Sequence, residues 1–129
     1  MRWRIVLRDI ATNVGQDGPQ LKPTSTLLAS TQKAEVCVVD CLTLWLSNLM
    51  QHDRDVDAEA AALCEAIPKL TIPVILVSNE VGLGLVPETP LGRKFRDAQG
   101  RLNQAVANVC NRVEFVAAGL PITLKGEGM

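Results

Sequence analysis

A chain of 129 residues, 47% of them hydrophobic and 21% charged, can bury the core of one domain and is too apolar to stay disordered. Its formal net charge of −1 gives no electrostatic reason to bind nucleic acid or a membrane surface. Aromatic residues make up only 3% and include no tyrosine, which argues against stacking of single-stranded bases. Because we find no signal peptide and no apolar run near the ~18 residues of a membrane span, we expect a cytoplasmic protein.

The cysteines and the single histidine do not form a metal-binding pattern. Cys37, Cys41, Cys64 and Cys110 lack the close CxxC pairs of a zinc site, so we expect reduced thiols that pack as small hydrophobic side chains. His52 lies in a polar turn without a partner motif, and we expect it to be solvated. No bound prosthetic group is predicted.

The first 34 residues are less regular than the rest. Trp3–Leu7 could form a strand, residues 13–26 are rich in Gly, Pro, Ser and Thr and resemble a loop, and residues 27–33 could form a short helix. We treat residues 1–129 as a single domain without internal repeats.

From residue 35 onward, strand and helix patterns alternate. We expect strands at 35–40, 73–78, 112–117 and, more briefly, 121–124, with helices at 42–50, 56–70 and 90–110. The continuous apolar run at 35–40 predicts a strand buried on both faces of a parallel sheet. The alternation predicts an α/β fold with an open, mainly parallel sheet.

Two polar positions follow strands of this sheet, where parallel α/β proteins bind their ligands. Asp40 follows Val-Cys-Val-Val, the pattern of a Walker B strand whose carboxylate holds magnesium. An equally weighted alternative makes Asp40 the N-cap of the next helix, since Asp is favoured there. Asn79 and Glu80 end the second strand in the same way.

The connection from Glu80 to Thr89 carries Gly82 and Gly84, which allow close approach of backbone to a ligand. A single GxG is weak evidence, and the third glycine of a dinucleotide fingerprint is missing. The connection is longer than most strand-to-helix loops, which favours a functional role.

The helix at 90–110 has two stripes. The core stripe comprises Phe95, Ala98, Leu102, Val106 and Val109, and the neighbouring stripe comprises Arg93, Arg96, Gly100 and Asn103. The second stripe could be a solvated face, in which Arg93 pairs with Asp97. A mid-helix glycine costs about 1 kcal/mol relative to alanine, so Gly100 favours a close contact with a backbone or a ligand.

Together these segments resemble the bifunctional adenosylcobinamide kinase / adenosylcobinamide-phosphate guanylyltransferase family of cobalamin (vitamin B12) biosynthesis. The resemblance is carried by Asp40–Asn48 (DCLTLWLSN), Asn79–Pro87 (NEVGxGxVP), Arg93–Asp97 (RxFRD) and Gly100–Gln104 (GxxNQ). Trp3-Arg4 resembles the start of an earlier family segment. The combination is far more specific than any one glycine pair.

This resemblance implies a P-loop nucleotide-binding (RecA-like) fold, a homotrimer, and two transfer reactions. ATP or GTP with Mg²⁺ would phosphorylate adenosylcobinamide, and GMP would then be transferred through a guanylylated histidine. It further implies that Asp40 is a catalytic residue and a magnesium or nucleotide contact. Nucleotide- or substrate-binding positions would be Asn79, Glu80, Gly82, Gly84, Arg93, Arg96, Asp97 and Asn103.

The chain departs from the family pattern at its N-terminal side. It contains no GxxxxGK[ST], no histidine before Trp3, and Leu7 where the family tends to have a nucleotide-contacting glutamate. We therefore expect a C-terminal portion of the family fold that lacks the P-loop strand and helix, and that exposes a sheet face or edge. Either it is an N-terminally truncated enzyme, catalytically incomplete alone, or it is a non-catalytic binding or assembly subunit.

Overall fold

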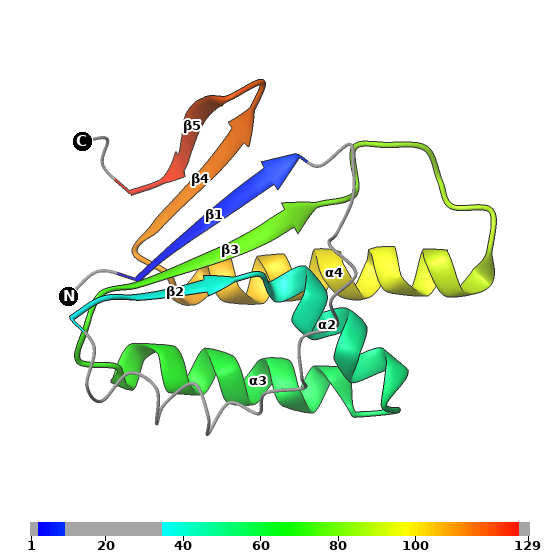
Figure 1. Cartoon of the computed structure of the whole chain (residues 1–129), viewed down its shortest axis with the longest axis horizontal. Helices are drawn as coiled ribbons and strands as arrows, with labels where there is room; N and C mark the ends of the chain where they lie inside the picture. Colours follow the sequence, from blue (N-terminus) through cyan, green and yellow to red (C-terminus); the bar gives the residue numbers. More distant parts are fainter. Residues whose placement is uncertain (1–2, 10–34, 127–129) are drawn as a thin grey trace.

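In the part of the chain that the structure describes, five strands form one sheet (Figure 1). The structure is a computed structural model that describes the backbone of residues 3–9 and all atoms of residues 35–126. The sheet order is β2-β3-β1-β4-β5, with β1 at Trp3–Asp9, β2 at Cys37–Asp40, β3 at Val74–Glu80, β4 at Arg112–Ala117 and β5 at Leu120–Lys125. The loop and short helix expected at 13–26 and 27–33 lie outside the described residues.

The expected α/β fold with an open, mainly parallel sheet is confirmed. β1 runs parallel to both β3 and β4, and β2 runs parallel to β3. Of the five described strands, only β5 is antiparallel, and a two-residue turn at Ala118 and Gly119 joins it to β4. Both turn residues have positive φ, 52° and 75°, as the tight turns of twisted hairpins require.

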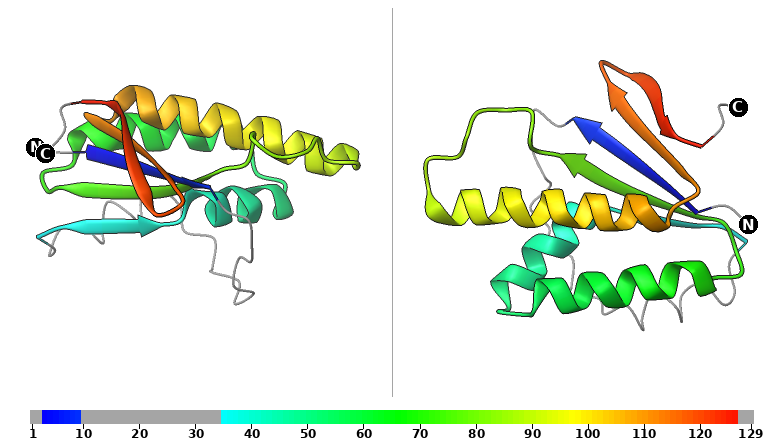
Figure 2. Two further views of the ribbon diagram at one scale, coloured as in Figure 1. Left: turned by 90° about the horizontal axis from the view of Figure 1, so that it is seen from above. Right: turned by 180° about the vertical axis from the view of Figure 1, so that it is seen from behind.

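Between residues 35 and 126, three α-helices connect the strands: α2 at Leu42–Gln51, α3 at Val56–Ala66 and α4 at Pro90–Val109. Helices α3 and α4 lie side by side on one face of the sheet (Figure 2). The side chains of Asp55 and Thr89 cap α3 and α4 at their N-termini, and Pro90 occupies the first turn of α4. Helix α3 ends four residues earlier than expected, because Pro68 shifts the chain into the short 3₁₀ turn η1 at Ile67–Lys69.

The core lies between the helices and the sheet. Its fully buried members include Leu42, Leu46, Ile67, Val74, Leu76, Leu102 and Val106. The predicted core stripe of α4 is confirmed, since Ala98, Leu102 and Val106 are buried and Phe95 and Val109 pack against the core. Cys41 and Cys110 are also buried, and all four cysteines are free thiols.

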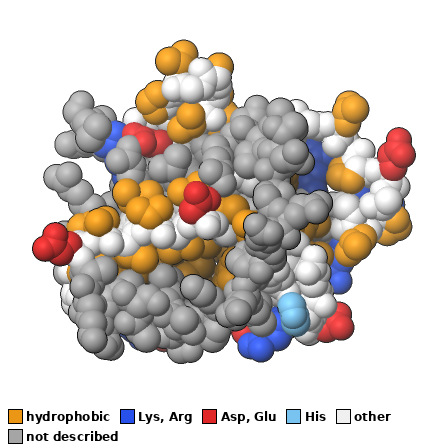
Figure 3. All heavy atoms as spheres, viewed as in Figure 1, with side chains coloured by type: hydrophobic (Ala, Val, Ile, Leu, Met, Phe, Trp, Pro, Cys, Tyr) orange, Lys and Arg blue, Asp and Glu red, His pale blue; other side chains and the backbone are white. Residues whose placement is uncertain are grey.

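The expectation that the first apolar run is buried on both faces is wrong. β2 is an edge strand, and Val38 points away from the helices with 58% of its surface exposed. At the other edge, Leu120, Ile122 and Leu124 of β5 are exposed as well. In the view of Figure 3, hydrophobic side chains are visible near β2 and at the β4–β5 hairpin, the two edges of the sheet. Among the residues described, no helix is long and apolar enough to cross a membrane.

Candidate functional site at the carboxyl edge of the sheet

Asp40 and Glu80 end two neighbouring parallel strands. Asp40 is paired in register with Val77, so the end of β3 extends three residues beyond the end of β2. The side chain of Asp40 is exposed. The N-cap of α2 is Cys41, at which no side-chain capping hydrogen bond is made, so the alternative that Asp40 is the N-cap is wrong. A carboxylate at the exposed end of a parallel strand can meet a ligand.

Behind this edge lies a buried network of neutral polar side chains. Asn103 on α4 accepts a hydrogen bond from the Ser78 hydroxyl at 2.6 Å and donates one to the Asn79 carbonyl at 3.0 Å. The backbone amide of Asn79 in turn donates to Thr43 Oγ1 on α2 at 3.0 Å. Because these groups are almost completely buried, they fix the end of β3 relative to two helices.

Gln99 also belongs to this network, but only its side-chain nitrogen is hydrogen-bonded. Its Nε2 donates to Ser78 Oγ at 3.0 Å and to Asn103 Oδ1 at 2.9 Å. Since the Asn103 amide is oriented by the Asn79 carbonyl, Gln99 must present its amino group to Asn103. Its Oε1 is consequently buried without a hydrogen-bond partner among the described residues.

The loop after β3 is tied down at its base. Glu80 Oε1 accepts a hydrogen bond from the Gly82 amide at 2.7 Å, and Arg96 donates to the Gly82 carbonyl at 2.6 Å. A Cβ at Gly82 would lie 2.8 Å from Glu80 Oε1, so this turn needs a glycine or a displaced Glu80. At Gly84 a Cβ would meet no atom within 4 Å, leaving its backbone approachable.

Arg93 holds the other end of the loop. It donates to the carbonyls of Pro87 and Glu88, at 3.1 Å each, rather than pairing with Asp97 as expected for a solvated face. A Cβ at Gly92 would lie 2.9 Å from the Cβ of Pro87, so the loop packs tightly on the start of α4. The two arginines of the predicted stripe therefore shape the loop.

The structure separates the predicted site residues into groups. Asp40, Glu80, Gly82 and Arg96 lie at or near the carboxyl edge, whereas Asn103 is buried behind it and Asp97 is exposed on α4. The close contact expected at Gly100 is not found within the described part of the chain, where a Cβ would meet nothing within 4 Å. His52 is exposed as expected, with Nδ1 2.8 Å from the Asn48 carbonyl.

Sequence reasoning missed Thr43, Ser78 and Gln99. The available signal was Gln99 four residues before Asn103, which places two amides one turn apart beside the core stripe.

A three-residue metal cage is not part of this site. Among residues 35–126, no group of three His, Cys, Asp or Glu side chains could hold a metal ion. Burial raises the pKa of the Cys37 and Cys64 thiols above their ordinary value of 9.0, which disfavours the thiolate that a metal would need. Any divalent cation here would depend on carboxylates such as Asp40 together with ligand oxygens and water.

A mainly parallel sheet with polar groups at its carboxyl edge and a tethered glycine loop places this chain among the α/β proteins, a class in which ligands bind at that edge. The family model described as cobinamide kinase / cobinamide phosphate guanyltransferase matches residues 18–124. The chain therefore belongs to this family, and its fold agrees with the expected P-loop-like class. The segment at Trp3-Arg4 lies before the matched residues, so its resemblance stays a prediction.

Curated relatives agree with this assignment. The chain is 48% identical over 105 residues to the bifunctional adenosylcobalamin biosynthesis protein CobP of Pseudomonas aeruginosa, covering 80% of this chain and 61% of the relative. It is 37% identical over 106 residues to CobU of Escherichia coli, covering 70% of this chain and 59% of the relative. The chain thus spans about three-fifths of the length of these relatives.

Proposed function

We propose that this chain forms the nucleotide- and adenosylcobinamide-binding part of an adenosylcobinamide kinase / adenosylcobinamide-phosphate guanylyltransferase of cobalamin biosynthesis. The observation that carries the proposal is the carboxyl edge itself. There, Asp40 and Glu80 end adjacent strands of a chain that belongs to the family. Such an enzyme would transfer phosphate from ATP or GTP and then GMP to cobinamide.

The exposed carboxylate of Asp40 fits a role toward Mg²⁺. Magnesium keeps several waters and is usually bound through one or two carboxylates plus substrate phosphates, so a single strand-end aspartate suits it. When bound, the ion would neutralise charge on the phosphates. The chain's own contribution is to hold Asp40 at the edge, next to the end of β3 that the buried amide network fixes.

The loop and α4 would complete the binding surface. Gly84 offers an approachable backbone, while Arg96 has guanidinium donors beyond the one used on Gly82 and could meet a phosphate. Asn79 and Asn103 would act from behind, by fixing the strand end. Asp97 and Arg93 stay proposed contacts to ligand or to a neighbouring subunit. A cytoplasmic homotrimer is part of this proposal.

A second candidate is a non-catalytic binding or assembly subunit. The observation that favours it is the absence of GxxxxGK[ST] from these 129 residues, because phosphoryl transfer uses that loop to cradle the β- and γ-phosphates. The two candidates differ in turnover. The first predicts that labelled phosphate is transferred from GTP to adenosylcobinamide when a longer family member that contains GxxxxGK[ST] is added. The second predicts binding alone.

Calorimetric titration of the 129-residue chain with GTP and Mg²⁺ tests the binding proposal. We expect saturable binding that Asp40→Asn weakens at least about tenfold and Asp53→Asn leaves unchanged. Asp53 is the matched control, an exposed carboxylate in the turn after α2. No heat of binding at millimolar nucleotide would overturn the proposal for this chain, and equal effects of both variants would remove Asp40 from the site.

A further inference from the structure

The loop between β3 and α4 exposes three aliphatic side chains to water. Leu83, Leu85 and Val86, which we call the apolar tip, are 69%, 97% and 65% exposed. Aliphatic side chains that gather on one exposed loop mark a surface for an apolar partner. Because residues 81–87 include no charged residue, no side chain of this stretch can pair with a phosphate.

The protein holds this loop at both ends. Arg96 donates a hydrogen bond to the Gly82 carbonyl at 2.6 Å, and Arg93 donates to the carbonyls of Pro87 and Glu88 at 3.1 Å each. The apolar tip lies between these two anchors, so a tethered backbone presents its side chains to solvent. A surface that is ordered before binding loses less conformational entropy when a ligand arrives.

The apolar tip is continuous with the carboxyl edge of the sheet. Its loop begins directly after Glu80, the last residue of β3, and runs to the N-terminal end of α4 (Figure 1). Between Leu83 and Leu85, a Cβ at Gly84 would meet nothing within 4 Å, so the main chain there is approachable. A broad ligand held at the carboxyl edge can therefore extend over the tip.

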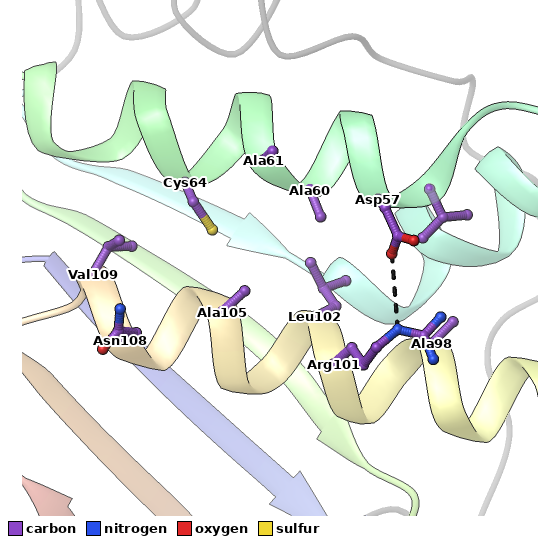
Figure 4. Close-up of a pocket in the computed structure, with 11 residues that line it drawn as sticks. Asp57, Ala60, Ala61, Cys64, Ala98, Arg101, Leu102, Ala105, Asn108 and Val109 are labelled. Carbon is purple, nitrogen blue, oxygen red and sulfur yellow. Dashed lines mark ion pairs between the residues drawn. The ribbon is translucent and has the colours of Figure 1, made fainter.

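A second apolar feature, the α3–α4 groove, is built from the helix layer instead. It has a volume of ≈ 320 Å³, and Figure 4 shows Cys64, Ala98 and Leu102 among the side chains that line it from α3 and α4. Asp57 and Arg101 form an ion pair across it, with Oδ1 and Nε 3.8 Å apart. This volume is at the lower end of the about 300–1,000 Å³ of pockets for drug-sized ligands, so a macrocycle does not fit.

We infer that the apolar tip contacts the corrin ring of cobinamide and not the nucleotide. The inference rests on the proposed function, which brings two ligands to the carboxyl edge. A nucleoside triphosphate presents charged phosphates, which suit Arg96 and an ion held by Asp40. A corrin ring is a broad macrocycle with methyl groups and neutral amide side chains, which suit aliphatic side chains beside an approachable main chain.

This contact assigns the two ligands to different parts of one loop. The tip side chains would contribute to cobinamide affinity by removing apolar surface from water, and they would contribute nothing to GTP affinity. Burial of apolar surface gives binding a negative heat-capacity change. Affinity and heat capacity for the corrin ring should therefore both depend on the tip.

Calorimetric titration of the 129-residue chain with dicyanocobinamide tests the inference. This compound keeps the corrin ring and lacks the adenosyl group and any phosphate. The double variant Leu83→Gln/Leu85→Gln should bind it at least about tenfold more weakly, with a smaller negative heat-capacity change. Its affinity for GTP with Mg²⁺ should stay within about twofold of the parent value. Both positions are exposed, so the fold should be retained, as circular dichroism would verify.

Two control variants test the location of the contact. Leu120→Gln on β5 replaces the same residue type at the same exposed fraction as Leu83, 69%. Ala105→Trp places a bulky side chain in the α3–α4 groove. Neither variant should change the affinity for dicyanocobinamide by more than about twofold.

A parent chain that does not bind dicyanocobinamide, or a double variant that binds it as tightly as the parent, would overturn the tip contact while GTP binding stands. Weakening by Ala105→Trp alone would overturn it too, because the ring would then lie in the groove. Equal weakening of GTP would assign the tip to the nucleotide. Altered sedimentation of the double variant at unchanged dicyanocobinamide affinity would assign the tip to another copy of the chain.

The proposed function can fail separately from this inference. A parent chain that binds dicyanocobinamide through the tip but shows no heat of binding with GTP and Mg²⁺ would contradict the nucleotide site and leave the tip contact standing.

Discussion

At the scale of single residues, the site depends on buried amides more than on the exposed charges near them. Asn103 contacts both Ser78 and the main chain of Asn79, which connects α4 to the last residues of β3. Arg93 and Arg96 use donors on loop carbonyls. The residues of one predicted stripe thus have different roles: Asn103 fixes the end of β3, whereas Arg93 and Arg96 fix the loop that follows it.

Replacing Asn103 should be costly, whereas replacing Gln99 should not. Asn103→Ala leaves the Asn79 carbonyl and the Gln99 amino group with fewer partners, so we expect the free energy of unfolding to fall by about 2–3 kcal/mol. Gln99→Met removes an acceptor that has no partner and leaves Ser78 bonded to Asn103, so stability should stay within about 0.5 kcal/mol or rise. Urea unfolding measures both.

The exposed neighbour Gln104→Ala is the control for the same helix and should change stability by less than about 0.5 kcal/mol. A Gln99→Met variant as unstable as Asn103→Ala would contradict this prediction, because it would show that the two hydrogen bonds donated by Gln99 Nε2 outweigh the cost of burying its unpaired Oε1.

At the scale of elements, Arg96 joins the loop to α4 across 14 positions of sequence through one hydrogen bond to Gly82. Arg96→Met should loosen the loop without unfolding the protein, since the core side chains of α4 are untouched. We expect faster hydrogen exchange of amides from Gly82 to Glu88 and an unchanged midpoint of thermal unfolding within about 2 °C. Unchanged exchange in this loop would show that Arg96 is not its tether.

The C-terminal end of α4 is held by the last residue of β5. Lys125 Nζ donates to the carbonyls of Ala107 and Asn108 at 3.0 and 3.1 Å, where the helix leaves carbonyls unpaired and its dipole favours a cation. Lys125→Met should therefore lower the free energy of unfolding by about 0.5–1.5 kcal/mol. Lys94→Met near the other end of the helix is the control and should have no such cost; equal losses would contradict the capping role.

Sequence patterns predicted most elements closely, because strand and helix periodicity survives in the core. The strand at Arg112–Ala117 has the predicted bounds, and α4 begins at Pro90 as its capping signals indicate. The prediction that β2 is buried on both faces failed for a physical reason. An apolar run such as Val36–Val39 is compatible with both a central strand and an edge strand. Only the order of strands in the sheet distinguishes the two.

The candidate site was predictable in part. Asp40 and Glu80 could be placed at strand ends, since parallel strands share one carboxyl edge. The burial of Asn103 and the loop contacts of Arg96 could not, because they depend on how far α4 is rotated against the sheet. A small rotation of α4 about its axis would exchange which of two neighbouring positions faces the core and which faces solvent.

At the scale of the whole molecule, Cys110 makes stability depend on alkaline pH. Burial raises its pKa from 9.0 to about 12; Cys64 raises it further, and Lys125 partly offsets the shift. The folded thiol therefore stays protonated while the unfolded thiol ionises above pH 9.0, so the unfolded state binds fewer protons. Stability from this thiol is complete below that pH and is lost as pH rises toward about 12.

Comparison with Cys110→Ala between pH 8.5 and 10.5 measures this effect. The parent chain should lose more stability across the interval than the variant, by up to about 1.4 kcal/mol for each pH unit above the unfolded pKa. Parallel pH curves for the two proteins would show that the Cys110 thiol does not stay protonated in the folded state.

The most direct test of the central claim is a map of where nucleotide binds. Backbone ¹H–¹⁵N spectra of the 129-residue chain, recorded during titration with GTP and Mg²⁺, locate the site without mutation. We predict the largest shifts at Asp40–Thr43 and Ser78–Gly84, with smaller ones near Arg96. Shifts confined to the α3–α4 groove or to β5, or none at millimolar nucleotide, would contradict a ligand site at the carboxyl edge.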